Sequence, residues 1–154
     1  MTAPAWRLAI VAAGTGEHAA LQALRERLLR VPLGLRFTAG ELTAEATDVH
    51  IAALDPSGVI GGVLLRPLDD GSGKLRQMAV AETHQRRGVG AALVRMLEEE
   101  ARRRGMRQIV LHARDHATGF YAALGYAVEG APFAEIGIPH VRMVKRLGAT
   151  ATVR

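Results

Sequence analysis

The spacing of apolar residues predicts a chain in which strands and helices alternate. Val89, Leu93, Met96 and Leu97 recur three and four positions apart, so a helix there would carry one apolar face that can pack on a sheet. Short apolar runs bounded by glycine, proline or aspartate are typical of strands. The pattern predicts strands at 6–13, 49–54, 59–68, 75–80, 108–113, 126–128 and 139–146, and helices at 17–30, 89–104 and 114–124.

Local features refine this order of elements. The strand 6–13 is apolar nearly throughout, which predicts burial on both of its faces. Asp55-Pro56-Ser57-Gly58 predicts the turn of a hairpin, and Gly61-Gly62 in the following strand predicts a bulge or a close approach of another segment. Residues 33–47 show no clean period, so we expect a loop there with a short helix near 43–46.

Charged residues on the two longer helices predict solvated faces. Glu98–Glu100 precedes Arg102–Arg104 by four residues, the acid-first order that stabilises an exposed helix face. Arg25, Arg27 and Arg30 fall on the polar side of the helix 17–30, and we expect water to surround them as well.

The clearest chemical signal is the turn Gln85-Arg86-Arg87-Gly88-Val89-Gly90-Ala91 between the strand 75–80 and the helix 89–104. Its glycines remove side chains where a ligand would approach the backbone, and the first N–H groups of a helix have no partner within the helix. Arg86 and Arg87 add positive charge. The turn therefore predicts a cradle for phosphate groups, and a solvated helix start that binds nothing is the plainer alternative.

Composition narrows the class of protein. The 154 residues suffice for one domain whose core needs no disulfide or metal ion. The absence of cysteine excludes thiol nucleophiles, thiolate metal sites and disulfides, and fits a reducing compartment. The apolar run 6–13 is too short to span a bilayer. We expect a cytoplasmic protein without a metal site and without a membrane partner.

The net charge of +5 would permit binding to nucleic acid. Aromatic residues make up only 4% of the chain, however, and the sequence contains no recognised nucleic-acid motif. We therefore expect no nucleic-acid partner. A ligand that carries several phosphates would account for part of the positive charge.

The phosphate cradle resembles the Q/R-x-x-G-x-G/A acyl-CoA motif of the GNAT (general N-acetyltransferase) superfamily. Two further segments strengthen the resemblance: 120–126 (FYAALGY) is similar to the F-Y-x-x-L-G-F/Y segment of that family, and 135–143 (EIGIPHVRM) is similar to the G-I-P-H-x-x-M ending of one bacterial branch. The match is strong over 73–147 and loose before it.

This resemblance implies an α/β (α+β) fold with a mixed central sheet of about six to seven strands and helices on both faces. The sheet would splay between the strand before the cradle and the strand after its helix. The domain would cover 1–147, and 148–154 would form a flexible tail.

The resemblance also implies the reaction. An N-acetyltransferase would move an acetyl group from acetyl-CoA, its co-substrate, to a primary amine by direct attack in a ternary complex. Tyr121 matches the general acid of the family: its phenol, with a pKa of about 10, stays protonated near neutral pH, whereas a thiol has a pKa of about 8.5. The residues that match CoA-binding positions are Met78, Ala79, Val80, Gln85, Arg86, Arg87, Gly88, Val89, Gly90, Ala91 and Asp115.

Some of these matches are imperfect. Asp115 stands where the family commonly has Asn, although it is also a good candidate to cap the helix 114–124. The strand before the cradle offers Gln77 where a carboxylate could serve as a base. His112, Glu135, His140 or a water molecule could take that role, and we expect Glu135 and His140 to line the acceptor side.

Asp48 and His50 also match an acidic residue and a histidine of the same bacterial branch. The plainer interpretation of His50 is a structural group at the start of a strand. Determinants of the acceptor would lie in the loop 33–47 and in the final strands.

Two other functions remain compatible with the sequence. A non-catalytic acyl-CoA-binding or regulatory module would keep the cradle and lose the chemistry. A dinucleotide-binding enzyme would explain part of a G-x-G-x-x-G pattern, but Leu93 replaces the third glycine and the preceding strands are joined as hairpins. The sequence also makes a homodimer plausible if the last strand lies at an edge of the sheet.

Overall fold

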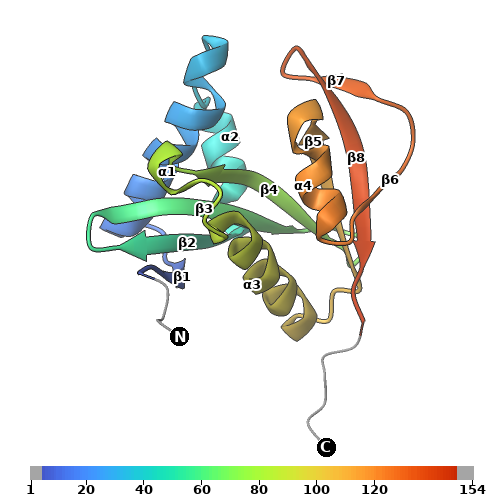
Figure 1. Cartoon of the computed structure of the whole chain (residues 1–154), viewed down its shortest axis with the longest axis horizontal. Coiled ribbons are helices and arrows are strands. Elements are labelled where there is room, and N and C mark those ends of the chain that lie inside the picture. Colours follow the sequence, from blue (N-terminus) through green and yellow to red (C-terminus); the bar gives the residue numbers. More distant parts are fainter. Residues whose placement is uncertain (1–4, 149–154) are drawn as a thin grey trace, which may run out of the picture.

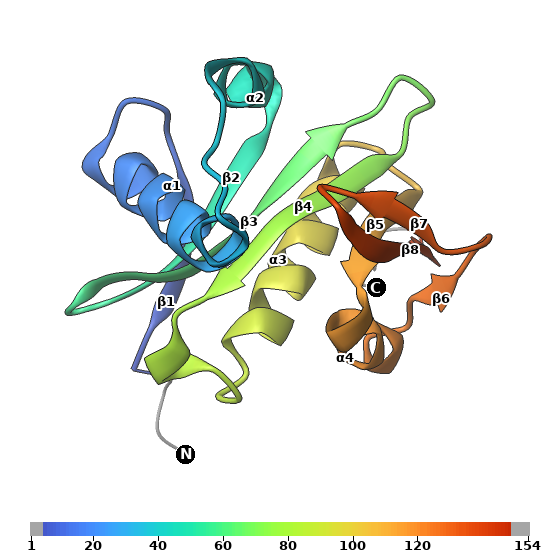
Figure 2. The ribbon, with the colours of Figure 1, turned by 90° about the horizontal axis from the view of Figure 1, so that it is seen from above.

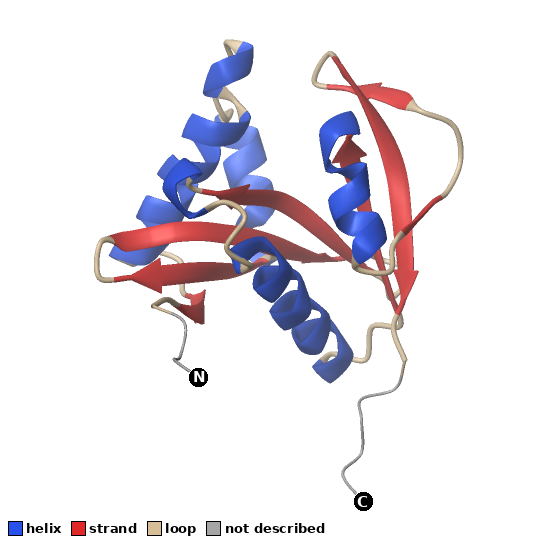
Figure 3. Ribbon diagram, in the orientation of Figure 1, coloured by secondary structure: helices blue, strands red, loops and turns tan. Residues whose placement is uncertain are grey.

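The computed structural model describes residues 5–148 and contains one sheet with helices packed on it (Figures 1 and 3). The strands are β1 (Arg7–Val11), β2 (Val49–Asp55), β3 (Gly58–Pro67), β4 (Gly73–Val80), β5 (Gln108–Arg114), β6 (Ala127–Val128), β7 (Phe133–Glu135) and β8 (Ile138–Arg146). The α-helices are α1 (Gly16–Leu29), α2 (Ala39–Ala44), α3 (Val89–Arg103) and α4 (Thr118–Ala123), and short 3-10 helices are η1 (Val31–Leu33), η2 (Glu45–Thr47), η3 (Glu82–His84) and η4 (Asp115–Ala117). Residues 149–154 of the expected tail lie outside the described residues.

The sheet has the order β1-β2-β3-β4-β5-β8-β6, with β7 paired to β8. All of these pairs are antiparallel except β4 with β5. The predicted mixed sheet is confirmed. It has eight strands because Phe133–Glu135, which lie outside every strand predicted from the sequence, form β7 against β8.

The sheet opens between its two parallel strands. β4 pairs with β5 only through Gly73–Leu75 and Ile109–Leu111, and the remainder of β4 runs away from β5 in Figure 1. The cause lies in β4, where Gln77 and Met78 together face Val63 of β3 and shift the register of the pair. Gln77 has a φ of 59°, the left-handed backbone of a bulge, and a bulge bends its strand.

Helices cover both faces of the sheet, as predicted (Figure 2). The apolar side of α3 is fully buried, with Val89, Leu93, Leu97 and Ala101 all at 0% exposure. The three- and four-residue spacing in the sequence therefore marks the real core face of this helix. On the opposite face, Leu21 of α1 packs with Val11, Ala52 and Leu54.

Two adjacent glycines of β3 allow both helices to approach the sheet closely. A Cβ atom on Gly61 would lie 3.4 Å from Val89 and 3.5 Å from Leu93 of α3. On the other side of the strand, a Cβ atom on Gly62 would lie 2.2 Å from a methyl carbon of Leu21, which is closer than any real contact. The predicted close approach at this pair of glycines is confirmed.

Two expectations about burial and one about the edge of the sheet are wrong. β1 is an edge strand and leaves Ile10 46% exposed, so it is not buried on both faces. β8 lies between β5 and the short strands β6 and β7, so the argument for a homodimer through an edge at the last strand does not hold. Glu98 is only 4% exposed, because it accepts hydrogen bonds from Tyr126 and Lys145 across the core instead of facing Arg102 in water.

The segment predicted as a loop at 33–47 is more helical than expected. Thr38 begins α2 with a capping box, in which its side chain accepts from the Glu41 backbone while the Glu41 side chain accepts from the Thr38 backbone.

Across residues 5–148, no helix has the length and apolar composition to cross a membrane.

Candidate functional site

The predicted phosphate cradle joins the end of β4 to the start of α3. Arg86 and Gly88 have left-handed φ values of 63° and 84°, and Gly88 is the N-cap residue of α3 without any capping side chain. Gln85 is tied to the last residue of β4, since its Nε2 donates to the Val80 carbonyl at 3.0 Å. The turn from 85 to 88 is exposed.

This geometry suits an anion. The first N–H groups of α3 donate to no capping side chain, and the positive end of the helix dipole lies at the same place. A Cβ atom on Gly88 would meet nothing within 4 Å, so the space in front of the turn is open. The residues present therefore fit the diphosphate of a nucleotide ligand such as coenzyme A.

The end of β4 offers a free strand edge beside the cradle. Val80 and Ala79 pair with Gly61 and Gly62 of β3 on one side. On the side of β5, β4 has no pairing beyond Leu75 within the described residues. Met78–Val80 can therefore accept an extended ligand arm as an additional strand-like partner.

Tyr121 lies on α4, which packs beside the cradle. Its neighbour Phe120 is placed so that a Cβ atom on Gly90 of α3 would lie 3.2 Å from the Phe120 ring. Tyr121 is 5% exposed. Its hydroxyl has no hydrogen-bond partner in residues 5–148, but the oxygen is not completely buried and so keeps some contact with solvent. Burial raises the pKa of the Tyr121 phenol above its ordinary value, which keeps the proton on its oxygen at neutral pH.

Asp115 follows β5 directly and forms η4, near the cradle side of α4. The prediction that it caps the following helix is wrong, because Ala117 is the N-cap residue of α4 and no side chain caps it. The Asp115 carboxylate is exposed, while its backbone carbonyl accepts from the Thr118 hydroxyl at 3.0 Å.

The three candidate bases of the sequence form one cluster. His112 on β5 has its Nδ1 2.8 Å from the Glu135 carboxylate on β7, and His140 on β8 lies 3.7 Å from the same carboxylate. The ring of Phe133 packs against both imidazoles. Burial alone would raise the pKa of Glu135, but the hydrogen bond from His112 and the nearby positive charges lower it below its ordinary value.

The tautomers in this cluster follow from the partners. A carboxylate accepts only, so His112 donates from Nδ1 and, when neutral, keeps a free lone pair on Nε2. His140 donates from Nδ1 to the Ile138 carbonyl at 3.0 Å and is only 3% exposed. His112, which is more exposed than His140, is therefore better able to take a proton from a ligand.

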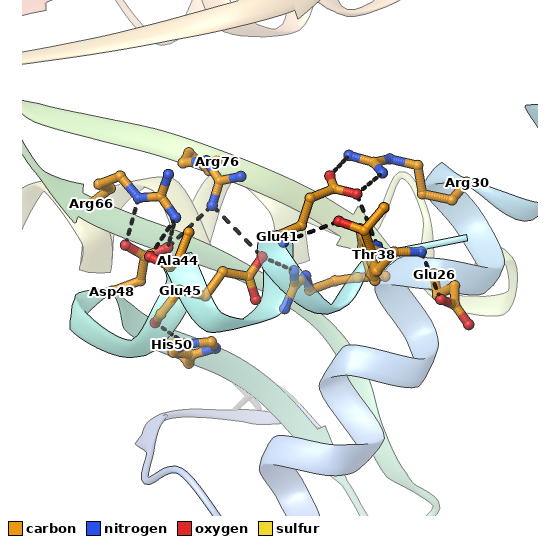
Figure 4. Close-up of polar contacts among 12 residues, drawn as sticks. Glu26, Arg30, Thr38, Glu41, Ala44, Glu45, Asp48, His50, Arg66 and Arg76 are labelled. Atoms are coloured by element: carbon orange, nitrogen blue, oxygen red, sulfur yellow. Dashed lines mark hydrogen bonds and ion pairs between the residues drawn. The ribbon is translucent and has the colours of Figure 1, made fainter. Parts of the chain in front are cut away.

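A buried network of charges lies beside α2 and η2 (Figure 4). Arg25 of α1 donates to Glu45 at 2.5 Å, with the Arg25 side chain 1% and the Glu45 side chain 5% exposed. Arg66 of β3 binds both oxygens of Asp48 at 2.8 and 3.0 Å. Arg76 of β4 joins the two pairs, 3.1 Å from Asp48 and 3.7 Å from Glu45.

The same charges hold the segment that follows α1. The Phe37 ring lies between the guanidinium groups of Arg25 and Arg30, at 4.9 and 4.8 Å. Arg30 is 7% exposed and binds both oxygens of Glu41 in α2. The prediction that Arg25 and Arg30 are solvated is wrong. We call residues 25–48 the α1–α2 cover.

The network assigns structural partners to two residues singled out in the sequence. Asp48 has both carboxylate oxygens occupied by arginines. His50 lies 3.4 Å from the Glu45 carbonyl and its ring packs on His18, with ring centroids 4.6 Å apart. Burial lowers the pKa of His50. These contacts agree with the plainer, structural interpretation of His50.

One feature of the site has no counterpart in the sequence pattern. Gln77 sits at the bulge with a left-handed φ of 59°, and its Oε1 atom is buried without a hydrogen-bond partner among the described residues. Strain and an unsatisfied buried acceptor are both unfavourable and often mark functional positions. The bulge at Gln77 is visible only as a shift in the register between β3 and β4, which the sequence alone does not give.

The structure thus gathers the predicted residues into two groups around the opening of the sheet. The cradle, Met78–Val80, Asp115 and Tyr121 lie on the side of α3 and α4. His112, Glu135 and His140 form the second group, on strands at the far side of the opening. A ligand in the opening could contact both groups at once.

Comparisons with known proteins agree with this arrangement. Residues 36–147 match the model of a family described as an acetyltransferase (GNAT) domain. The chain is 35% identical over 102 residues to YjcF of Bacillus subtilis, an uncharacterised N-acetyltransferase, and this match covers 66% of the chain and 72% of YjcF. It is also 35% identical over 79 residues to the uncharacterised B. subtilis protein YyaT, covering 51% of the chain but only about half, 53%, of YyaT.

Solved structures have the same fold. A Lactobacillus plantarum protein assigned as an N-acetyltransferase superposes with a TM-score of 0.81 at 25% identity, over 94% of this chain and 99% of that one. An aminoglycoside 6'-N-acetyltransferase in complex with coenzyme A superposes with a TM-score of 0.74 at 19% identity, over 95% of this chain and 99% of that one. At this identity, the second structure is evidence for the fold alone.

Proposed function

The chain belongs to the GNAT acetyltransferase family, and from this premise we propose that it transfers an acetyl group from acetyl-CoA to a primary amine by direct attack in a ternary complex. GNAT acetyltransferases act on small-molecule or peptide amines. The observation that supports the proposal most is the opening between β4 and β5, which has an anion cradle and a protonated phenol on one side and an imidazole oriented by a carboxylate on the other.

The cradle side holds the co-substrate. Backbone N–H groups in the segment 86–91 donate to the diphosphate, with Arg86 and Arg87 adding charge and Gln85 bracing the turn. The free edge of Met78–Val80 pairs with the pantetheine arm, and Asp115 offers a polar contact to it. A backbone N–H near Ala79 polarises the thioester carbonyl, a kind of contact worth about 3 kcal/mol to a reaction of this type.

Tyr121 acts as the general acid. Its raised pKa keeps the phenol protonated, and its hydroxyl is free to donate to the sulfur of the departing thiolate. Because thiols have a pKa near 8.5 and phenols near 10, transfer of the phenol proton to the thiolate sulfur is uphill, and the phenolate that it leaves regains a proton from water.

His112 acts as the general base. The amine arrives as an ammonium ion and must lose a proton before its lone pair can attack. With Nδ1 donating to Glu135, the Nε2 lone pair of His112 is available for that proton, and Glu135 stabilises the imidazolium that results. His140 on β8 lies beside the same carboxylate.

The experiment measures thiol release from acetyl-CoA over a panel of primary amines. Tyr121→Phe should lower kcat about 100-fold or more. His112→Gln should lower kcat/KM most strongly at low pH and partly recover as the amine deprotonates on its own. Tyr126→Phe is the matched control, because that second buried tyrosine donates to Glu98 and should retain normal turnover per folded molecule. Normal turnover in Tyr121→Phe would remove Tyr121 from the acid role.

The alternative of a non-catalytic acyl-CoA-binding module makes a different prediction. Such a protein would bind CoA through the same cradle and release no thiol with any amine. The proposal of a transferase would then be wrong while the cradle would stand.

A further inference from the structure

The half of the opening that faces α1 and α2 carries more positive than negative side chains. They are distributed over α1, β3, β4, β5 and β7 and the segments that follow α1. The cations are Arg25, Arg30, Arg66, Lys74, Arg76 and Arg114, and the carboxylates are Glu41, Glu45, Asp48 and Glu135.

Every one of these carboxylates already has a partner. Glu45 binds Arg25, Glu41 binds Arg30, and Asp48 is shared by two arginines of β3 and β4. Glu135 accepts from His112. A neutral His112 does not cancel the charge of Glu135, so one carboxylate charge lies near the remaining two cations.

Those two cations are Lys74 and Arg114. Within residues 5–148, the Lys74 side chain has no hydrogen bond and no carboxylate within 4.0 Å. The Arg114 side chain makes one hydrogen bond within these residues, from Nη2 to the Leu29 carbonyl at 2.9 Å. Both side chains are half-buried. Their free N–H groups are not completely buried, so a ligand can reach them.

Both cations lie next to the candidate base. Lys74 is in register with Val110, two residues before His112 on β5, and Arg114 is two residues after it. Residues two apart on a strand point to the same face. Glu135 is close enough to favour the charged form of both Lys74 and Arg114, while burial and neighbouring arginines disfavour it and lower the pKa of each.

Two half-buried cations near a single carboxylate, Glu135, favour an anionic ligand, because an anion would compensate for the water they have lost. A substrate whose only charge is its ammonium group would instead meet their repulsion. A substrate with an ammonium and a carboxylate satisfies both sides of the site, with the amine at His112 and Glu135 and the carboxylate at Arg114 and Lys74.

We propose that the acceptor is an amine that also carries a carboxylate, held by Arg114 and Lys74 on either side of His112. This inference rests on the proposed function and specifies its substrate class. Free amino acids and the carboxyl-terminal residues of peptides share this chemistry. Guanidinium binding of a carboxylate by two parallel hydrogen bonds gives Arg114 the larger share of the recognition.

The first test compares matched amines with and without the carboxylate, such as L-phenylalanine with 2-phenylethylamine and L-ornithine with putrescine. Thiol release from acetyl-CoA is a clean readout because the chain itself contains no cysteine. We expect kcat/KM to be about tenfold or more higher for the acid in each pair. Short lysine peptides with a free or an amidated C-terminus distinguish a peptide acceptor from a free amino acid. Equal or better turnover of the amines that lack a carboxylate would overturn the inference and leave the proposed function intact.

The second test uses charge-neutral variants. Arg114→Gln and Lys74→Gln should reduce the ratio of kcat/KM between the acid and its matched amine about tenfold, mainly through KM for the acid. Arg107→Gln is the control, because Arg107 precedes β5 at the opposite end from Arg114, is exposed and carries the same charge; it should leave the ratio unchanged. An unchanged ratio in both Arg114→Gln and Lys74→Gln would contradict the inference.

A third measurement does not depend on turnover. N-acetyl-phenylalanine should raise the melting temperature of the CoA-bound protein more than N-acetyl-2-phenylethylamine does, and Arg114→Gln should abolish the difference. If no amine releases thiol but this difference is seen, the proposed function fails while the carboxylate site stands. If the two ligands stabilise the protein equally, the carboxylate site is wrong.

Discussion

α3 with its cradle and the α1–α2 cover lie on opposite faces of the sheet, and they are held in place by different forces. α3 is anchored by an apolar face that is fully buried, and its turn has positive φ values at Arg86 and Gly88. The cover is anchored by buried ion pairs, with Phe37 between two guanidinium groups.

This difference has a physical consequence. Apolar burial is not directional, so an anchored helix tolerates small shifts in its partners. Buried ion pairs depend on geometry, because each charge has lost its water and only a well-placed partner compensates. We expect the cover to be more sensitive than the cradle to single substitutions of its polar residues.

The largest effect should come from breaking one pair in the cover. Arg25→Met leaves Glu45 buried with Arg76 as its nearest remaining cation, 3.7 Å away. We expect a loss of about 3–5 kcal/mol in the free energy of unfolding, measured by denaturant titration. A loss below about 1 kcal/mol would mean that the pair is not what holds the cover.

A double variant separates the charge from the packing. In Arg25→Met with Glu45→Met, no buried charge is left without its partner at this pair, so most of the stability should return. If the double variant were as unstable as Arg25→Met alone, the shape of the side chains rather than their charge would explain the effect.

A smaller effect is expected at the cradle. Gly88→Ala places a side chain at a φ of 84° in open space, so its cost in stability is that of the left-handed backbone, about 1 kcal/mol. Binding of CoA, measured by calorimetry, should weaken severalfold as the turn relaxes. Gly119→Ala is the control. A Cβ atom on Gly119 would also meet nothing within 4 Å, and Gly119 lies in α4 without a positive φ, so this substitution should not lower the stability.

The smallest effect at neutral pH concerns Glu41. The hydrogen bond from Arg30 lowers the pKa of Glu41 to about 2 from its ordinary value of 4.5, although burial opposes this. A carboxyl with a lowered pKa stabilises the fold above its ordinary pKa, and this contribution is lost as the pH falls from 4.5 through about 2.

Glu41→Gln should therefore destabilise the protein by about 0.5 kcal/mol at neutral pH, since the carboxylate is partly exposed, and flatten the loss of stability in acid. Thermal unfolding as a function of pH measures both. Asp69→Asn is the control, because Asp69 is exposed and forms no ion pair with the described residues. The same acid dependence in Glu41→Gln as in the parent would contradict the assignment.

The part of the fold around α3 could be predicted from the sequence because its information is local. The spacing of Val89, Leu93 and Leu97 gives the buried face, and glycines mark the turn where the backbone must be left-handed or open. The resemblance to the GNAT family rests on the same stretch, and the family and the mixed, splayed sheet are confirmed.

The cover could not be predicted in the same way. Arg25 and Arg30 look like solvated residues of a polar helix face, and their burial depends on Glu45 and Glu41, which lie in a segment without a period. Glu98 was misassigned for a similar reason, since its partner Lys145 is 47 residues away. Ion pairs between distant residues leave no periodic pattern in a sequence.

The two adjacent glycines of β3 limit where this fold can change. At Gly61 and Gly62 a single layer of backbone separates α3 from α1, so the positions of both helices depend on the absence of side chains there. Any side chain at Gly62 would push Leu21 of α1 away from the sheet. We therefore expect related sequences to vary on the exposed faces of the helices and to keep small residues at these two positions, where one added methyl group would displace a helix.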